Sequence, residues 1–136
     1  MNLNEQKMVV TGAGGGMGFH FSKRIVEAGG MVAAGDVNAE GLSVLEKECE
    51  GLPGKVFTRE LNVADEGSIA GFVDWAHESM GGMTGLVNNA GILRDALLVK
   101  KARTTGEIIK LGSDAWQAVI DVNLTGATFM VRDVVA

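Results

Sequence analysis

The stretch TGAGGGMG, residues 11–18, decides the fold class of this 136-residue chain. It follows the apolar run KMVVT at residues 7–11, which is typical of a short buried strand. Residues 16–28 then carry apolar side chains at helical spacing, which predicts a helix that begins among the glycines. Glycine permits tight turns and places no side chain above the backbone. The sequence therefore predicts a strand, a glycine-rich loop and a helix in direct succession.

Strand and helix continue to alternate along the chain. Three further strands are expected, at residues 31–36, 55–61 and 85–89. Asn38 and Asp65 are placed to cap the helices that follow the second and third strands, and a long last helix is expected from about Ser113 or Asp114. Because such repeats form a parallel sheet covered on both faces, we expect one α/β domain over residues 1–136, a Rossmann-type doubly wound parallel sheet.

Two features in the last third of the sequence depart from this alternation. Residues 96–111 are too many for a simple loop between strand and helix, and a small β-hairpin centred on Thr105-Gly106 is expected there. The last helix is expected to bury an apolar stripe along one face. That stripe consists of Trp116, Val119, Ile120, Leu124, Ala127, Val131 and Val134.

The composition of the chain excludes several classes of protein and of binding partner. A net charge of −5 argues against a nucleic-acid partner, and no apolar run approaches the ~18 residues of a membrane span. The polar start MNLNEQK does not resemble a signal peptide, and the lone Cys49 cannot form an internal disulfide. Both features predict a cytoplasmic protein. Cys49 is expected to be a small core residue, and no metal site is expected.

The glycine-rich loop is a candidate phosphate site. Its position between strand and helix brings free N–H groups at the helix start toward an approaching anion, helped by the helix dipole. In this context the glycines favour a dinucleotide pyrophosphate, and the alternative is a purely structural turn.

Asp36 ends the second strand, 18 residues after Gly18. A carboxylate near this spacing accepts hydrogen bonds from ribose hydroxyls and repels a 2′-phosphate. Gly15 and Val37, the neighbours that would otherwise pair with that phosphate, carry no positive charge. Asp36 therefore favours NAD over NADP, with capping of the next helix as the alternative role.

Three ordered motifs together resemble the short-chain dehydrogenase/reductase family from Lys7 onward. They are TGxxxGxG at residues 11–18, NNAG at 88–91 and VNL at 122–124. The stretches GILRD (91–95) and VNLTG (122–126) look most like the 3-oxoacyl-acyl-carrier-protein reductase branch. The resemblance implies NAD(P)-dependent oxidoreduction of a ketone or alcohol, including a 3-oxoacyl thioester. The alternative is a non-catalytic NAD-binding or self-associating fragment.

The resemblance also implies which residues bind the cofactor. They are Thr11, Gly12, Gly16, Met17 and Gly18 at the phosphates, Asp36 at the adenosine ribose, Asn62 and Val63 at the adenine, and Asn89, Ala90 and Gly91 on the ribose side. The family usually has aspartate where this chain has Asn62, but an amide oxygen still accepts a hydrogen bond from the adenine amino group. Asn88 is expected to tie neighbouring strands together.

Asn123 is the one catalytic residue that the resemblance assigns to this chain. In the family this asparagine holds a water in a proton relay to a lysine. It falls on the apolar stripe, between Ile120 and Leu124, where an unpaired amide costs ~1–3 kcal/mol. The alternative is therefore a satisfied core amide or a helix kink.

The family's serine and its Tyr-x-x-x-Lys pair are expected beyond Ala136, and the chain contains no tyrosine. We therefore expect the chain alone to be inactive, since loss of a proton donor alone costs about 10²–10⁴-fold in rate. The family's sheet order, restricted to four strands, is 3-2-1-4, which makes the fourth strand an edge. An exposed edge and the last helix predict self-association, at least to a homodimer.

Overall fold

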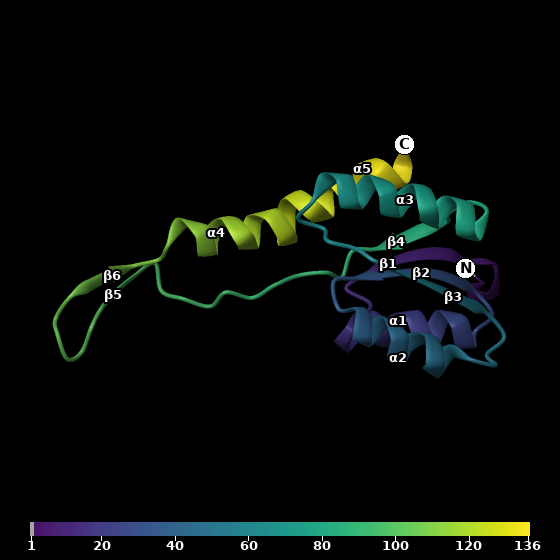
Figure 1. Cartoon of the computed structure of the whole chain (residues 1–136), viewed down its shortest axis with the longest axis horizontal. Coiled ribbons are helices and arrows are strands. Elements are labelled where there is room, and N and C mark those ends of the chain that lie inside the picture. Colours follow the sequence, from purple (N-terminus) through teal and green to yellow (C-terminus); the bar gives the residue numbers. More distant parts are fainter. Residues whose placement is uncertain (1) are drawn as a thin grey trace.

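The structure, a computed structural model that describes residues 2–136, contains a four-stranded parallel sheet with helices on both faces (Figure 1). The strands are β1 (Lys7–Thr11), β2 (Met31–Asp36), β3 (Lys55–Glu60) and β4 (Gly85–Val87). Their order across the sheet is β3-β2-β1-β4. The Rossmann-type fold class and the strand order predicted from the sequence are thereby confirmed.

Two pairs of helices cover the sheet (Figure 1). One face carries α1 (Gly16–Glu27) and α2 (Ala39–Cys49), and the other carries α3 (Glu66–Met80) and α5 (Ala127–Val135). A short 3-10 turn, η1 (Leu3–Glu5), precedes β1. Because side chains alternate across a strand, the adjacent and fully buried Val9 and Val10 of β1 enter opposite layers. The core therefore has two parts, one on each face of the sheet.

Helix caps follow the expectations from the sequence. The Asn38 side chain accepts a hydrogen bond from Gly41 N at the start of α2, and Asp65 accepts one from Ser68 N at the start of α3. Such caps pair N–H groups that a helix cannot satisfy itself. Gly81 ends α3 in the left-handed conformation, with φ of 64°.

The expected fourth strand, 85–89, is too long by two residues. β4 ends at Val87, because Asn88 and Asn89 turn away to contact other elements. β4 pairs with β1 alone among the described strands, so it forms one edge of the sheet.

The long last helix begins at Ser113 as expected. It runs through α4 (Ser113–Ile120), a π-helical segment η2 (Asp121–Gly126) that the sequence did not predict, and α5. The expected buried stripe is wrong for Trp116 and Leu124, which are 56% and 59% exposed. Val134 of the stripe does pack against the core, and Met130, which lies outside the stripe, is fully buried. The reason is that α4 extends beyond the sheet, so that α3 covers only the α5 end (Figure 1).

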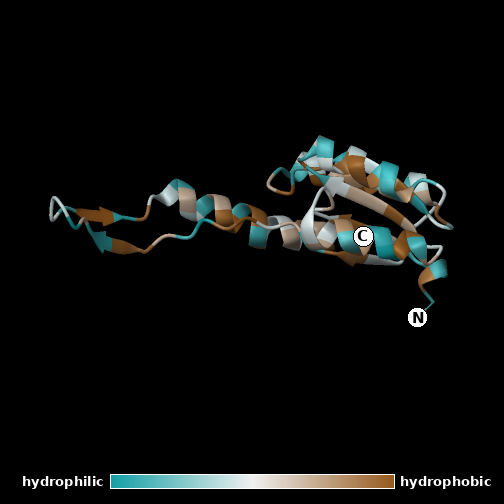
Figure 2. Ribbon diagram, turned by 90° about the horizontal axis from the view of Figure 1, so that it is seen from below, coloured by the Kyte–Doolittle hydropathy of each residue, from teal (hydrophilic) through white to brown (hydrophobic). Residues whose placement is uncertain are grey.

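Residues 96–111 contain an antiparallel pair, β5 (Val99–Lys101) and β6 (Ile108–Lys110). The chain reverses through Gly106, whose φ of 74° favours glycine. The hairpin and α4 project together from one end of the sheet, as both views show (Figures 1 and 2). None of the helices within residues 2–136 has the length and apolar character that a membrane span requires.

Candidate functional site

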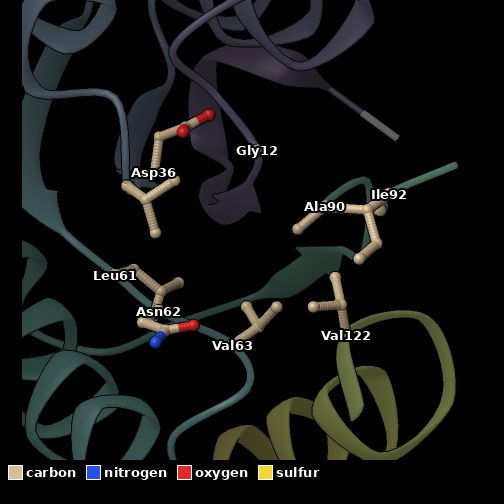
Figure 3. Close-up of a pocket in the computed structure, with 10 residues that line it drawn as sticks. Gly12, Asp36, Leu61, Asn62, Val63, Ala90, Ile92 and Val122 are labelled. Carbon is tan, nitrogen blue, oxygen red and sulfur yellow. The ribbon is translucent and has the colours of Figure 1, made fainter. Parts of the chain in front are cut away.

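A cleft of about 230 Å³ opens at the carboxyl ends of the sheet strands (Figure 3). Its lining comes from the ends of all four strands and from η2. The lining residues are Gly12, Asp36, Val37, Leu61, Asn62, Val63, Ala90, Gly91, Ile92 and Val122. A second hollow beside it is lined by Gly12, Gly14, Gly15, Gly16, Met17, Asp36, Asn38, Asn89, Ala90 and Gly91. Ligands of open α/β sheets bind at this edge.

The glycine-rich loop needs glycine at particular positions. Gly12 and Gly16 have φ of 67° and 53°, in the left-handed region. A Cβ on Gly18 would collide with the carbonyl oxygen of Gly12, and one on Gly12 would lie 2.9 Å from the Ala90 Cα. Gly15 is extended with open space around it, so it accepts other residues. The loop thus packs closely against the segment after β4, and its glycines leave the second hollow open for a ligand.

Helix α1 begins at Gly16, directly at this hollow. The first N–H groups of a helix have no partner within the helix, and its N-terminus carries a partial positive charge. Met17, 69% exposed, lies in this first turn. The loop and the helix start together form a geometry that suits an anionic group.

Asp36 connects the glycine-rich loop to the end of β2. Its Oδ2 accepts a hydrogen bond from Gly14 N at 2.8 Å, and its Oδ1 accepts one from Asn38 N at 2.9 Å. Each carboxylate oxygen retains a further lone pair for a ligand hydroxyl. The side chain that caps α2 is that of Asn38, so Asp36 does not have the alternative role of capping this helix. The carboxylate borders both hollows (Figure 3).

Thr11 lies beneath the loop, 1% exposed. Its Oγ1 accepts hydrogen bonds from Asn89 N at 3.1 Å and Ala90 N at 3.0 Å. The Asn89 amide donates in return to the carbonyl oxygens of Thr11 and Gly12, both at 3.1 Å. These four bonds fix the segment after β4 against the glycine-rich loop. Thr11 and Asn89 thus hold the wall of the site in place.

Asn62 and Val63 follow β3 and line the cleft opposite Asp36 (Figure 3). Asn62 Oδ1 accepts a hydrogen bond from Ala64 N at 3.0 Å. Because a backbone N–H can only donate, this bond also fixes which end of the amide is oxygen. The second lone pair of that oxygen remains available to a ligand donor.

Asn123 is bonded differently from the expectation of a buried amide. It is exposed and lies in η2, where Oδ1 accepts from Ile92 N at 2.8 Å and Nδ2 donates to Ile92 O at 2.9 Å. Both polar groups of the amide are thus paired with the segment after β4. Asn88 donates to Ala127 O at 2.9 Å, so it ties β4 to a helix where a neighbouring strand was expected.

Most of the residues predicted from the sequence surround the two hollows, but Thr11, Gly18 and Asn123 do not line either one. The apolar wall of the cleft, formed by Leu61, Ile92 and Val122, was not predicted from the sequence. No periodicity signals such a wall, because its members come from three separate segments. No lysine or arginine lines either hollow, and no group of three potential metal ligands occurs within residues 2–136.

A family model described as short chain dehydrogenase matches residues 6–136. The chain is 40% identical to 3-oxoacyl-(acyl-carrier-protein) reductase FabG of Thermotoga maritima, over 99% of this chain and 51% of the relative. It is 31% identical to 3beta-hydroxysteroid dehydrogenase 2 of Eggerthella lenta, over 98% of this chain and 48% of the relative. The chain therefore spans about half the length of the curated relatives it matches.

A solved short-chain type dehydrogenase/reductase from Mycobacterium marinum superposes with a TM-score of 0.82 at 25% identity. The match covers 98% of this chain and 50% of that structure. The fold, the glycine-rich loop at the strand ends and the family match agree over nearly the whole sequence. The chain belongs to the short-chain dehydrogenase/reductase family.

Proposed function

We propose that this chain binds NAD in the cleft at the strand ends and forms the cofactor-binding portion of an oxidoreductase. The reaction proposed for the whole protein is the interconversion of a ketone and an alcohol, with a 3-oxoacyl thioester as one candidate substrate. The similarity to a 3-oxoacyl-(acyl-carrier-protein) reductase supports this candidate. The family uses NAD or NADP, whose reduced form would supply the hydride for ketone reduction and whose oxidised form would accept it from an alcohol.

The observation that carries the proposal is the position of Asp36 between the glycine-rich loop and the apolar cleft. In the proposed complex the loop and the start of α1 hold the pyrophosphate, and Asp36 accepts the ribose hydroxyls. Asn62 and Val63 lie at the adenine end. The carboxylate and the absence of a lining cation both favour NAD, because a 2′-phosphate would meet a negative charge.

Within the reaction we assign Asn123 a positioning contribution through Ile92, in addition to the catalytic role that the family resemblance implies. The two hydrogen bonds to Ile92 hold the segment that borders the cleft. The chain contains no tyrosine, the proton donor that the resemblance implies, so we expect no turnover by these 136 residues alone. Oxidation of NADH with acetoacetyl thioester by the purified chain would contradict this part of the proposal.

Isothermal titration calorimetry with NAD and NADP tests the cofactor assignment. We expect NAD to bind more tightly than NADP, and Asp36→Asn to reduce this preference by removing the charge while keeping an acceptor oxygen. A hydrogen bond to a charged group contributes about 1.5–3 kcal/mol, so NAD should weaken by roughly 10–100-fold. Asp74→Asn, on α3 outside both hollows, is the matched control. Equal affinity of the unaltered chain for both cofactors would refute the NAD preference.

A homodimer or higher assembly through β4 and the last helix remains part of the proposal. It is supported by the free edge of β4 and by the exposure of Trp116, Leu124 and Val131. A cytoplasmic location is supported by the single Cys49, a buried free thiol. The alternative, a fragment that associates without binding NAD, predicts a folded oligomer that gives no heat with either cofactor.

A further inference from the structure

The β5–β6 hairpin carries aliphatic side chains that its own chain leaves uncovered. Leu98 is 69%, Val99 57% and Ile108 56% exposed, and the hairpin projects away from both core layers (Figure 2). A two-stranded hairpin is marginally stable in water unless a further element packs on it. These side chains therefore indicate a packing partner outside the chain's own fold.

The hairpin is also positively charged. Residues 96–112 hold four cations and one carboxylate, a net charge of +3, whereas the rest of the chain carries −8. None of these four cations makes an ion pair with any residue in the range 2–136. The strand register places aliphatic and cationic side chains together on both faces. One face presents Val99, Lys101, Ile108 and Lys110, and the other presents Leu98, Lys100, Ile109 and Leu111.

A groove between α3 and α5 has the complementary character. It encloses about 470 Å³, and its apolar lining consists of Val73, Met83, Val134 and Ala136. Asp74 and Asp133 line it as well. Asp133 is paired with Arg132, but Asp74 makes no ion pair among the described residues, and neither does Glu78 one turn further along α3. The groove thus combines apolar walls with the uncompensated, exposed carboxylate of Asp74, and the exposed Glu78 carboxylate follows one turn along the same helix.

The hairpin and this groove lie at opposite ends of the molecule. The hairpin extends beyond α4, while the C-terminal half of α3 lies over the far part of the sheet (Figure 1). The hairpin does not meet its own groove in this structure, so a match between the two requires two molecules. We propose that the hairpin of one copy docks into the α3–α5 groove of a second copy, and that the second hairpin docks reciprocally to close a dimer.

This contact differs from association through the β4 edge and does not depend on cofactor binding. It also covers the aliphatic side chains on one face of the hairpin, and it pairs Lys101 and Lys110 of that face with the Asp74 and Glu78 carboxylates. Because the charges lie at the surface, the attraction should weaken as the Debye length falls from ~10 Å at 0.1 M salt to ~3 Å at 1 M. Like charges in the same contact should oppose association.

Charge reversal with a mixing step tests the dimer by sedimentation velocity. The first variant is Lys101→Glu/Lys110→Glu on one face of the hairpin, and the second is Asp74→Lys/Glu78→Lys on α3 at the groove. Each variant alone brings like charges together, so each should weaken dimerisation at least tenfold. In an equimolar mixture both contacts again join opposite charges, so the mixed dimer should return to within a few-fold of the unaltered affinity.

Lys47→Glu/Lys55→Glu is the matched control, because it changes the net charge as much as the hairpin variant does but lies on α2 and β3. We expect this control to dimerise like the unaltered chain, and circular dichroism checks that all variants are folded. If the hairpin reversal variant does not fold, Lys101→Gln/Lys110→Gln replaces it, with a smaller expected weakening. A monomeric unaltered chain, a dimer insensitive to both reversals, or a mixture that fails to recover would each overturn the proposal. In the second case association through β4 would remain possible.

Discussion

Thr11→Val most directly tests whether the hydrogen bonds of the Thr11 hydroxyl hold the segment after β4 against the glycine-rich loop. Valine has nearly the shape of threonine but no hydroxyl, so the change removes the acceptor of Asn89 N and Ala90 N while preserving the packing. Thr11 is fully buried, and both N–H groups are partly buried. Leaving a buried donor unpaired costs about 1–3 kcal/mol. For two partly buried donors we expect a loss of about 2–3 kcal/mol.

Urea denaturation followed by circular dichroism measures this loss. Domains of this size have stabilities of about 5–15 kcal/mol and m-values of about 1–3 kcal/mol/M, so the midpoint should fall by on the order of 1 M. Thr11→Ser is the control, because it keeps the hydroxyl and loses one methyl group, at a cost of about 1 kcal/mol. All three proteins are compared at one concentration, since association shifts apparent stability.

Which of the two variants is less stable shows whether the hydroxyl or the methyl group of Thr11 matters more. If the hydroxyl holds the segment after β4 against the glycine-rich loop, Thr11→Val is less stable than Thr11→Ser. If Thr11→Ser were the less stable variant, packing of the methyl group would dominate, and the hydrogen bonds would not be what fixes the site.

Three further changes test other parts of the structure. Gly18→Ala should reduce both stability and NAD affinity, because its Cβ would collide with the Gly12 carbonyl oxygen. Gly15→Ala should leave the stability in urea denaturation unchanged, because a Cβ there meets open space. Equal losses of stability in the two variants would contradict the loop geometry. Asn123→Ala should accelerate hydrogen exchange at Ile92 N several-fold by removing its acceptor, and unchanged exchange would show that the bond is not maintained in solution. Burial raises the pKa of the Cys49 thiol, so the folded state resists ionisation, and the free energy of unfolding should fall as pH rises above about 8.5. Cys49→Ala should remove that slope, and a slope unchanged in this variant would assign it to another group.

The parts of this fold that follow from local backbone chemistry were predictable from the sequence. Gly12 and Gly16 adopt positive φ angles, and Gly18 lies too close to the Gly12 carbonyl for a side chain. Asn38 and Asp65 cap their helices through their own side chains. Apart from the approach of Ala90 to Gly12, these features depend on neighbours a few residues away in the sequence. The strand order followed from the family resemblance and was confirmed.

The features that the sequence did not predict depend on which segments meet in space. The apolar stripe of the last helix resembled a core face, but α4 extends past the sheet, and Trp116 there stays exposed. The bonds of Asn123 to Ile92 join residues 31 positions apart, which no local pattern signals. The π-helical segment η2 interrupts the last helix, and the spacing of apolar residues in that helix did not predict it. In each case tertiary packing decided the outcome.

Amide chemical-shift mapping with NAD most directly tests the central claim that the strand-end cleft binds this cofactor. The chain is labelled with ¹⁵N and titrated with NAD while its backbone N–H resonances are followed. We expect saturable shifts concentrated in residues 12–18, at Asp36, at Asn62 and Val63, and at residues 89–92. Shifts confined to other surfaces, or a folded chain whose spectrum does not respond to NAD, would contradict the account.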